Sequence, residues 1–175
     1  DRLWMRESGW RWNARNPSSG AYGIPQALAA SKMASAGSDW RTWTVLRTAT
    51  GEALPDRLTW SKFSCAAWTT DDAGFFYGAY PAPAAGDSLE APNRDMELRY
   101  HRLGTDQEDD VLVFATPHEP ERGFQREVAA DGRLLVISVW RGTDPESRLY
   151  VGDLRAGVAG TTIRPLLDAA DARYD

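Results

Sequence analysis

An internal repeat of strand, turn and apolar strand limits the folds that this chain can adopt. Residues 68–77 and residues 128–137 both follow this plan, with Asp-Asp or Asp-Gly near the turn. Asp-Gly between alternating strands is typical of a hairpin because both turn positions can adopt positive φ. From residue 42 onward, alternating apolar and polar residues are interrupted by Gly, Pro and Asp. This pattern predicts a mainly β fold built from a repeated hairpin.

A second hairpin is predicted after each copy of the first. These second hairpins cover residues 97–103 with 111–114, and residues 148–154 with 162–166. Leu98 and Leu149 of the second hairpins are 51 residues apart. Phe76 and Leu135 of the first hairpins are 59 apart, and the excess of eight is assigned to the Pro-, Ala- and Gly-rich loop at residues 81–93. Four strands in about 50 residues are typical of a β-propeller blade, and a β-sandwich is the alternative.

The first 41 residues differ from the rest in composition. They carry six basic and three acidic residues, whereas residues 42–175 carry 14 basic and 22 acidic residues. They also hold four of the eight Trp residues, and they predict a short helix, a polar loop at residues 13–20 and a second helical stretch at residues 25–33. We therefore expect a boundary near Trp40, with a small helical segment over residues 1–41 and about two four-stranded propeller blades over residues 42–175.

Several classes of protein are excluded by the residues that the sequence lacks. One Cys and two His form neither a disulfide framework nor a structural zinc site, so no metal or other cofactor is expected. No apolar run reaches about 18 residues and no secretory leader is present, so neither a membrane partner nor a signal peptide is expected. The net charge of −5 argues against a phosphate-binding surface, so nucleic acid is not an expected partner.

The N-terminal segment holds one candidate catalytic side chain, Glu7. It follows an apolar turn and lies close in sequence to Trp4 and Trp10. A carboxyl group held against apolar rings stays protonated more readily and can act as a general acid near neutral pH. The alternative is a solvated residue at the end of a helix, because glutamate is commonly exposed.

The surroundings of Glu7 also carry a family resemblance. Residues 6–10 and 13–28, which include Glu7-Ser8 and the run from Gly23 to Gln26, resemble the lytic transglycosylase domain of actinobacterial cell-wall proteins, a relative of goose-type lysozyme. The resemblance implies that Glu7 protonates the glycosidic oxygen of peptidoglycan and that Ser8 is its hydrogen-bonding neighbour. It also implies that Gly23 and Gln26 belong to a motif that lines the substrate. The third motif and last Tyr of that family are missing after Thr42.

Residues 35–175 carry a second resemblance. It rests on an ordered series of short motifs at residues 37–40, 54–56, 62–69, 75–77, 80–81, 100–107 and 142–145. Together these motifs resemble the N-terminal β-propeller of prolyl oligopeptidases. The resemblance implies a seven-bladed lid that filters short peptides toward an α/β-hydrolase domain, which carries the Ser, Asp and His of these serine peptidases. The sequence contains no Gly-x-Ser-x-Gly elbow, so no nucleophilic serine is nominated.

Three other reactive side chains are assigned no catalytic role. His101 lies in a predicted strand and His118 in a Pro-flanked loop. Cys65 stands beside two alanines in an alternating segment, where packing in the core is the expected role of the thiol.

Residues 35–42 fit both family patterns, so the chain is interpreted as a chimera that is engineered, computed or recombinant in origin. The favoured function is a prolyl-oligopeptidase propeller fragment that gates peptide access and is inactive alone. The alternatives are a peptidoglycan lytic transglycosylase that uses Glu7, and a chimera without activity. The expected partners are a peptide substrate, an α/β-hydrolase domain, or a second copy bound through exposed blade edges. The propeller parent implies a cytoplasmic location, and the N-terminal parent implies an extracellular or cell-wall location.

Overall fold

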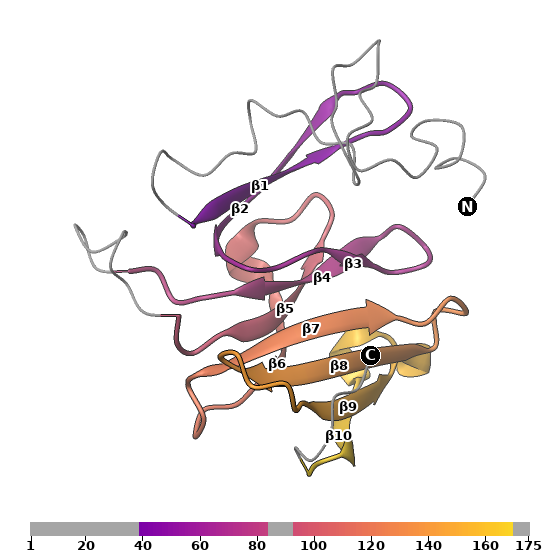
Figure 1. Ribbon diagram of the computed structural model, residues 1–175. Coiled ribbons are helices and arrows are strands. Elements are labelled where there is room, and N and C mark those ends of the chain that lie inside the picture. Colours follow the sequence, from indigo (N-terminus) through magenta and orange to yellow (C-terminus); the bar gives the residue numbers. More distant parts are fainter. Residues whose placement is uncertain (1–38, 84–92, 170–175) are drawn as a thin grey trace, which may run out of the picture.

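The computed structural model of the chain describes residues 39–83 and 93–169. In these two ranges, ten strands form antiparallel sheets (Figure 1). The strands are β1 (Arg41–Leu46), β2 (Ala53–Ser61), β3 (Ala67–Trp68), β4 (Gly74–Ala79), β5 (Glu97–Arg102), β6 (Val111–Ala115), β7 (Arg122–Val128), β8 (Leu134–Arg141), β9 (Arg148–Asp153) and β10 (Ile163–Leu167). Three short 3-10 helices are η1 (Gln107–Asp109), η2 (Leu154–Ala156) and η3 (Val158–Gly160). No helix of the described ranges is long and apolar enough to cross a membrane.

The strands form one two-stranded and two four-stranded sheets. β1 pairs with β2, the first four-stranded sheet has the order β3-β4-β5-β6, and the second has the order β10-β9-β8-β7. Each four-stranded sheet is thus a meander in which consecutive strands are neighbours. Figure 1 shows the three sheets following one another, with β1 and β2 at the top and β7 to β10 at the bottom. The prediction of a mainly β chain with two four-stranded blades is confirmed.

The repeated hairpin turns have the same geometry in both blades. The fourth residue of each five-residue loop donates its N–H to the carbonyl oxygen of the first, over 3.1 Å from Asp72 to Thr69 and 2.7 Å from Gly132 to Ala129. Only this fourth residue has positive φ, 55° at Asp72 and 71° at Gly132. Positive φ at both positions, which Asp-Gly permits, is not used here, because these loops are longer than the two-residue turns that require it.

The strand registers define which residues of the two blades are equivalent. Trp68 pairs with Phe75 in the first blade, and Val128 pairs with Leu135 in the second. Equivalent residues of the first hairpins are therefore 60 apart, and Phe75 rather than Phe76 corresponds to Leu135. The second hairpins keep their offset of 51, so the chain between the paired residues Ala79 and Glu97 is nine residues longer than the chain between their equivalents, Val139 and Arg148, and the excess is not eight. The slip of one residue matters because it exchanges the two faces of a strand.

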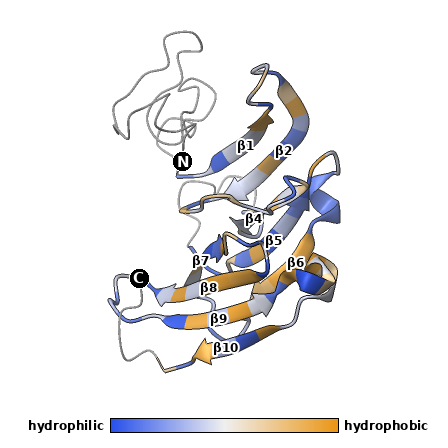
Figure 2. Cartoon of the chain, turned by 90° about the vertical axis from the view of Figure 1, so that its right-hand side faces the viewer, coloured by the Kyte–Doolittle hydropathy of each residue, from blue (hydrophilic) through white to orange (hydrophobic). Residues whose placement is uncertain are grey.

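Two hydrophobic cores lie between the three sheets, and β4 contributes to both. Phe75 and Tyr77 face the β1–β2 sheet, where they pack with Val45 and Leu58. Phe76 faces the second blade. The buried residues of that second core are Trp40, Phe76, Tyr80, Met96, Leu98, Phe124, Leu135, Ile137 and Val139. In Figure 2, hydrophobic colour follows β6 and much of β8. Because both of its faces are covered, all six residues of β4 are buried.

The helical segment predicted for residues 1–41 falls almost entirely on residues 1–38, which lie outside the described residues. Arg41 already belongs to β1, one residue before the predicted boundary at residue 42. In the described ranges, helical structure is limited to the three 3-10 turns.

Candidate functional site

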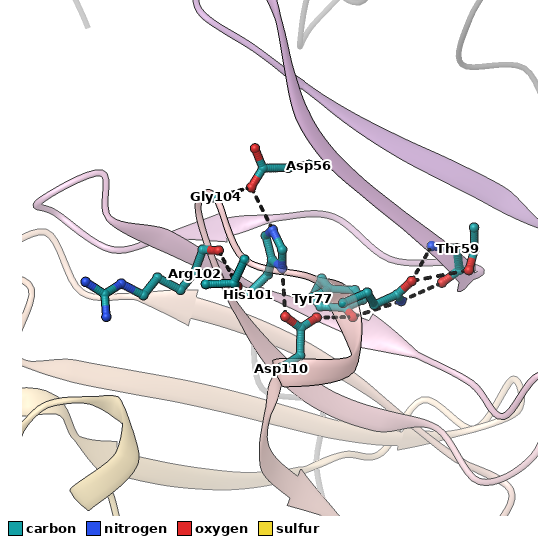
Figure 3. Close-up of polar contacts among 9 residues, drawn as sticks. Asp56, Thr59, Tyr77, His101, Arg102, Gly104 and Asp110 are labelled. Carbon is teal, nitrogen blue, oxygen red and sulfur yellow. Dashed lines mark hydrogen bonds and ion pairs between the residues drawn. The ribbon is translucent and has the colours of Figure 1, made fainter.

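A buried polar network connects the β1–β2 sheet to the first four-stranded blade, and His101 lies at its centre (Figure 3). His101 is in β5 opposite Phe75, and its side chain has no solvent exposure. Its Nδ1 atom lies 2.7 Å from Asp110 Oδ1, and its Nε2 atom lies 3.0 Å from Asp56 Oδ1. Both ring nitrogens are thus occupied by carboxylate oxygens of the same protein.

Asp56 brings the β1–β2 sheet into this network. It is a buried residue of β2, and its Oδ1 atom also accepts a 2.5 Å hydrogen bond from the Gly104 N–H. Gly104 has φ of 80°, a left-handed conformation that favours glycine. Burial acts to raise the pKa of the Asp56 carboxyl, but the hydrogen bonds from Gly104 and His101 outweigh it and lower the pKa below its usual value. The second oxygen, Oδ2, has no hydrogen-bond partner among the described residues.

Asp110 links His101 to the interior of the blade. Its Oδ2 atom accepts a 2.6 Å hydrogen bond from the Tyr77 hydroxyl, which in turn accepts a 3.1 Å hydrogen bond from Gln107 Nε2. Gln107 also bonds to the backbone of Thr59, with Nε2 donating to the carbonyl oxygen and Oε1 accepting from the N–H. The network therefore crosses from β4 and β5 to β2 at two places, Asp56 and Thr59.

This hydrogen-bond network connects the β1–β2 sheet to the first blade, and it does not expose His101 to a substrate. A cleft of about 680 Å³ opens beside the network between β2, β5 and η1, but His101 is not among its lining residues. Since both ring nitrogens are occupied and the side chain is enclosed, the structure favours the prediction that His101 is not catalytic. No group of three or more His, Cys, Asp or Glu side chains in the described ranges is arranged to hold a metal ion.

Substitution of Tyr77 by phenylalanine is expected to weaken the alkaline dependence of stability. Burial, followed by the hydrogen bond to Asp110, raises the pKa of the Tyr77 phenol. Because the folded-state pKa is above the unfolded value of about 10, this contribution is complete below about pH 10 and is lost as the pH rises. Urea unfolding between about pH 9 and 11 should show a shallower fall in unfolding free energy for Tyr77→Phe than for the parent chain. Parallel curves for the two proteins would contradict the assignment.

A second polar cluster lies between the two blades, around Arg126 of β7. Its guanidinium donates to Ser64 Oγ over 2.5 Å, to Phe124 O over 3.0 Å and to the Cys65 carbonyl oxygen. Burial lowers the pKa of Arg126 to about 10. These bonds connect β7 to the segment that leads into β3.

The prediction that Cys65 packs in the core is wrong, because its side chain is exposed. Cys65 lies between β2 and β3 rather than within a strand, so the alternation inferred from the sequence does not hold there. Its neighbour Ser64 points inward instead, and the Ser64 hydroxyl oxygen accepts a 2.8 Å hydrogen bond from the Gly78 N–H.

The site residues predicted for a lytic transglycosylase, Glu7, Ser8, Gly23 and Gln26, lie outside the described residues. His118 lies in the loop between β6 and β7, as the sequence predicted, and the structure shows it to be exposed. The sequence analysis did not identify Asp56 or Asp110 as partners of His101. Both partners lie near or within the short motifs of the second resemblance, but no local pattern joins residues that are 45 and 9 positions from His101.

Comparison with known proteins identifies relatives that cover most of the chain. The family profile described as "Prolyl oligopeptidase, N-terminal beta-propeller domain" matches residues 25–175. Prolyl oligopeptidase A of Amanita bisporigera is 33% identical over 128 residues, covering 70% of this chain and 17% of the relative. A prolyl endopeptidase of Elizabethkingia meningoseptica is 34% identical over 128 residues, covering 73% of this chain and 18% of the relative.

Solved structures agree with these relatives. A structure from a study of two prolyl endopeptidases and of the role of inter-domain dynamics in their catalysis and specificity has a TM-score of 0.70 and 36% identity, over 79% of this chain and 19% of that chain. Prolyl oligopeptidase B of Galerina marginata, bound to a 35mer hydrolysis and macrocyclization substrate, has a TM-score of 0.69 and 29% identity, over 79% and 21%. The chain thus spans about a fifth of the length of the proteins it matches.

Proposed function

Because the chain belongs to the prolyl oligopeptidase family, in the part that forms the N-terminal β-propeller domain, we propose that it gates the access of peptides to a catalytic domain. The observation that carries the proposal is the way the blades meet. β3, the first strand of one blade, contacts β7, the first strand of the next, and the sheets stack face to face with a buried core between them. First strands side by side are the arrangement that surrounds the channel of a propeller.

The proposed gate acts on peptides, and it acts together with an α/β-hydrolase domain that supplies the Ser, Asp and His. Support for a peptide comes from the Galerina relative, which was solved with a 35mer substrate. Support for a separate catalytic part comes from His101, which is enclosed by carboxylates and so cannot serve as the base of a triad. A cytoplasmic location belongs to the same proposal.

A segment swap tests the gate. The matching segment of the Elizabethkingia meningoseptica endopeptidase is replaced by residues 39–169 of this chain, and cleavage of a short Pro-containing peptide is compared with cleavage of a folded Pro-containing protein. We expect the swapped enzyme to cleave the peptide and to spare the folded protein. In the control, a Gly-Ser linker replaces the same segment, and the preference for the short peptide should be lost. If the swapped enzyme and the linker enzyme cleave the folded protein equally fast, the proposal is rejected.

A second candidate function rests on the N-terminal segment alone. Glu7-Ser8 and the run from Gly23 to Gln26 support a lytic transglycosylase origin and thus a chimeric chain. The propeller profile begins at residue 25, so it includes residues 25–41 of the segment assigned to the other family. The proposed foreign segment is then limited to the first 24 residues, which contain Glu7 but not Gln26.

Glu7 is expected to be required for any activity of this chain on cell walls. Glutamine keeps the size of the side chain but has no proton to donate, so Glu7→Gln should abolish release of 1,6-anhydro-muropeptides from peptidoglycan. The products are measured by chromatography, with Glu52→Gln as a control because Glu52 is exposed in the propeller part. Equal product release by the Glu7→Gln variant and the parent chain rejects the role of Glu7, and the absence of any release from the parent chain rejects the lytic transglycosylase function.

The exposed edge of β10 is expected to promote self-association. β10 pairs only with β9 in the described ranges, and it exposes Leu166 and Leu167. Unpaired strand edges recruit other edges, and lysine on an edge opposes this. Light scattering over a concentration series should show a mass that rises with concentration, and L166K/L167K should reduce that rise. Leu134→Lys is the control, because Leu134 is exposed on the inner strand β8. A monodisperse parent monomer would instead favour a cap formed by residues 1–41.

A further inference from the structure

We propose that His101 is held as a charged imidazolium that binds the β1–β2 sheet to the first blade, and that loss of one of its two ring protons weakens the contact between these two sheets. Both ring nitrogens lie within hydrogen-bond distance of a carboxylate oxygen, at 2.7 Å and 3.0 Å. A neutral imidazole has one N–H and can donate to one of them, whereas an imidazolium donates to both. Ionised carboxylates only accept hydrogen bonds, so the charged ring matches its two partners.

The groups that face His101 come from three elements besides its own strand. β2 contributes Asp56, the segment before β6 contributes Asp110, and β4 contributes Tyr77, which reaches the ring through Asp110. On β5 itself, Arg99 is paired with Glu97 at 2.7 Å, and Arg102 is exposed. In η1, the acidic residues Glu108 and Asp109 are exposed. The imidazolium is thus the cation that contacts both buried carboxylates directly.

The two contacts are not equivalent, and this determines which one fails first. Asp110 belongs to the same blade as His101, and both of its oxygens have partners. Asp56 belongs to the neighbouring sheet, its contact is longer, and its Oδ2 atom has no partner in the described part of the chain. When the ring is neutral, we therefore expect the remaining proton to stay on Nδ1 toward Asp110. The unprotonated Nε2 atom then faces an oxygen of Asp56, and a buried charge on β2 loses its compensation.

Other contacts between the β1–β2 sheet and the first blade keep the two sheets together when His101 is neutral, so the contact is weakened but not lost. Gln107 still bonds to Thr59, and the Ser61 hydroxyl still donates to Gly78 O over 2.7 Å. The core around Leu58 also remains buried. The blade itself should be unchanged, because its ladders do not depend on Asp56.

The charge state is tested by NMR on the complete 175-residue chain. Long-range proton–nitrogen spectra distinguish an imidazolium from either neutral tautomer, and the only other histidine, His118, is exposed and serves as the internal reference. We expect both ring nitrogens of His101 to carry a proton in the folded chain at about pH 7, since each faces a carboxylate oxygen. A spectrum of either neutral tautomer of His101 under these conditions overturns the proposal.

The contribution of the His101 proton to the sheet contact is tested by hydrogen exchange of residues 53–61 as the pH is raised, after correction for the intrinsic exchange rate. Protection of β2 should fall about tenfold over the pH range in which NMR shows His101 losing its proton, which is the size expected for one hydrogen bond between charged groups. Residues 134–141 of β8 should show no such step. Unchanged protection of β2 across the titration of His101, or a His101 that stays charged until the chain unfolds, overturns the proposed release.

Three variants complete the test. His101→Gln removes the charge, so β2 should have low protection that is independent of this titration. Asp56→Asn keeps the size of the side chain and an acceptor for Gly104, and should likewise remove the pH dependence even if His101→Gln does not fold. His118→Gln should behave as the parent chain. A pH step in Asp56→Asn that equals the parent step overturns the role of the Asp56 contact.

Discussion

Replacement of Asp110 by alanine is expected to lower the free energy of unfolding by about 3–5 kcal/mol, the cost of removing one partner of a buried charge pair. The Asp110 side chain is fully buried, and its two oxygens accept hydrogen bonds from His101 Nδ1 and from the Tyr77 hydroxyl. Alanine leaves both donors without a partner in a space closed to water, and an unsatisfied buried donor costs more than the bond itself contributes. Urea unfolding followed by tryptophan fluorescence measures the loss.

The neighbouring Asp109 provides the matched control for this substitution. Asp109 carries the same side chain one position earlier in the chain, but it is exposed in η1. Asp109→Ala should therefore change the unfolding free energy by no more than about 0.5 kcal/mol. Equal effects of the two substitutions would show that the network around Asp110 does not contribute to stability.

Replacement of Phe124 by alanine is expected to cost about 3–5 kcal/mol, the range for a large side chain removed from a close-packed core. Phe124 has no solvent exposure and lies between the two blades, where its ring packs edge-on against Phe114 at 5.2 Å. The cavity would open at the interface between two sheets. Because adjacent blades of a repeat protein are stabilised mainly by their shared interface, the two blades should lose stability together.

The same substitution at Phe63 separates the cavity from the loss of a phenylalanine as such. Phe63 is 50% exposed in the segment between β2 and β3, so Phe63→Ala removes little buried surface. A single cooperative unfolding transition at lower urea is expected for Phe124→Ala, and almost no shift for Phe63→Ala. Two separate transitions in the parent chain would contradict the view that the blades share one core.

The hairpins could be predicted from the sequence because their information is local. The alternation of residues and the turn residues around Asp72 and Gly132 identified the first hairpin of each blade, and the structure places strands at both positions. A hairpin joins strands that are adjacent in the chain, so the periodicity and the loop between them define the pairing without distant residues. The segment over residues 1–41 stays a prediction, since Glu7 and its motif lie outside the described residues.

The class of fold, the two four-stranded blades and the absence of a serine elbow in this segment could thus be predicted from the residues alone. The structure was needed to assign residues to the two cores and to the surface: Phe75 rather than Phe76 corresponds to Leu135, and Ser64 rather than Cys65 points inward. It also brought Asp56 to His101 across 45 positions of the chain. Alternation divides a strand into two faces, whereas the neighbouring sheets determine which core each face joins and which buried polar groups must find partners there.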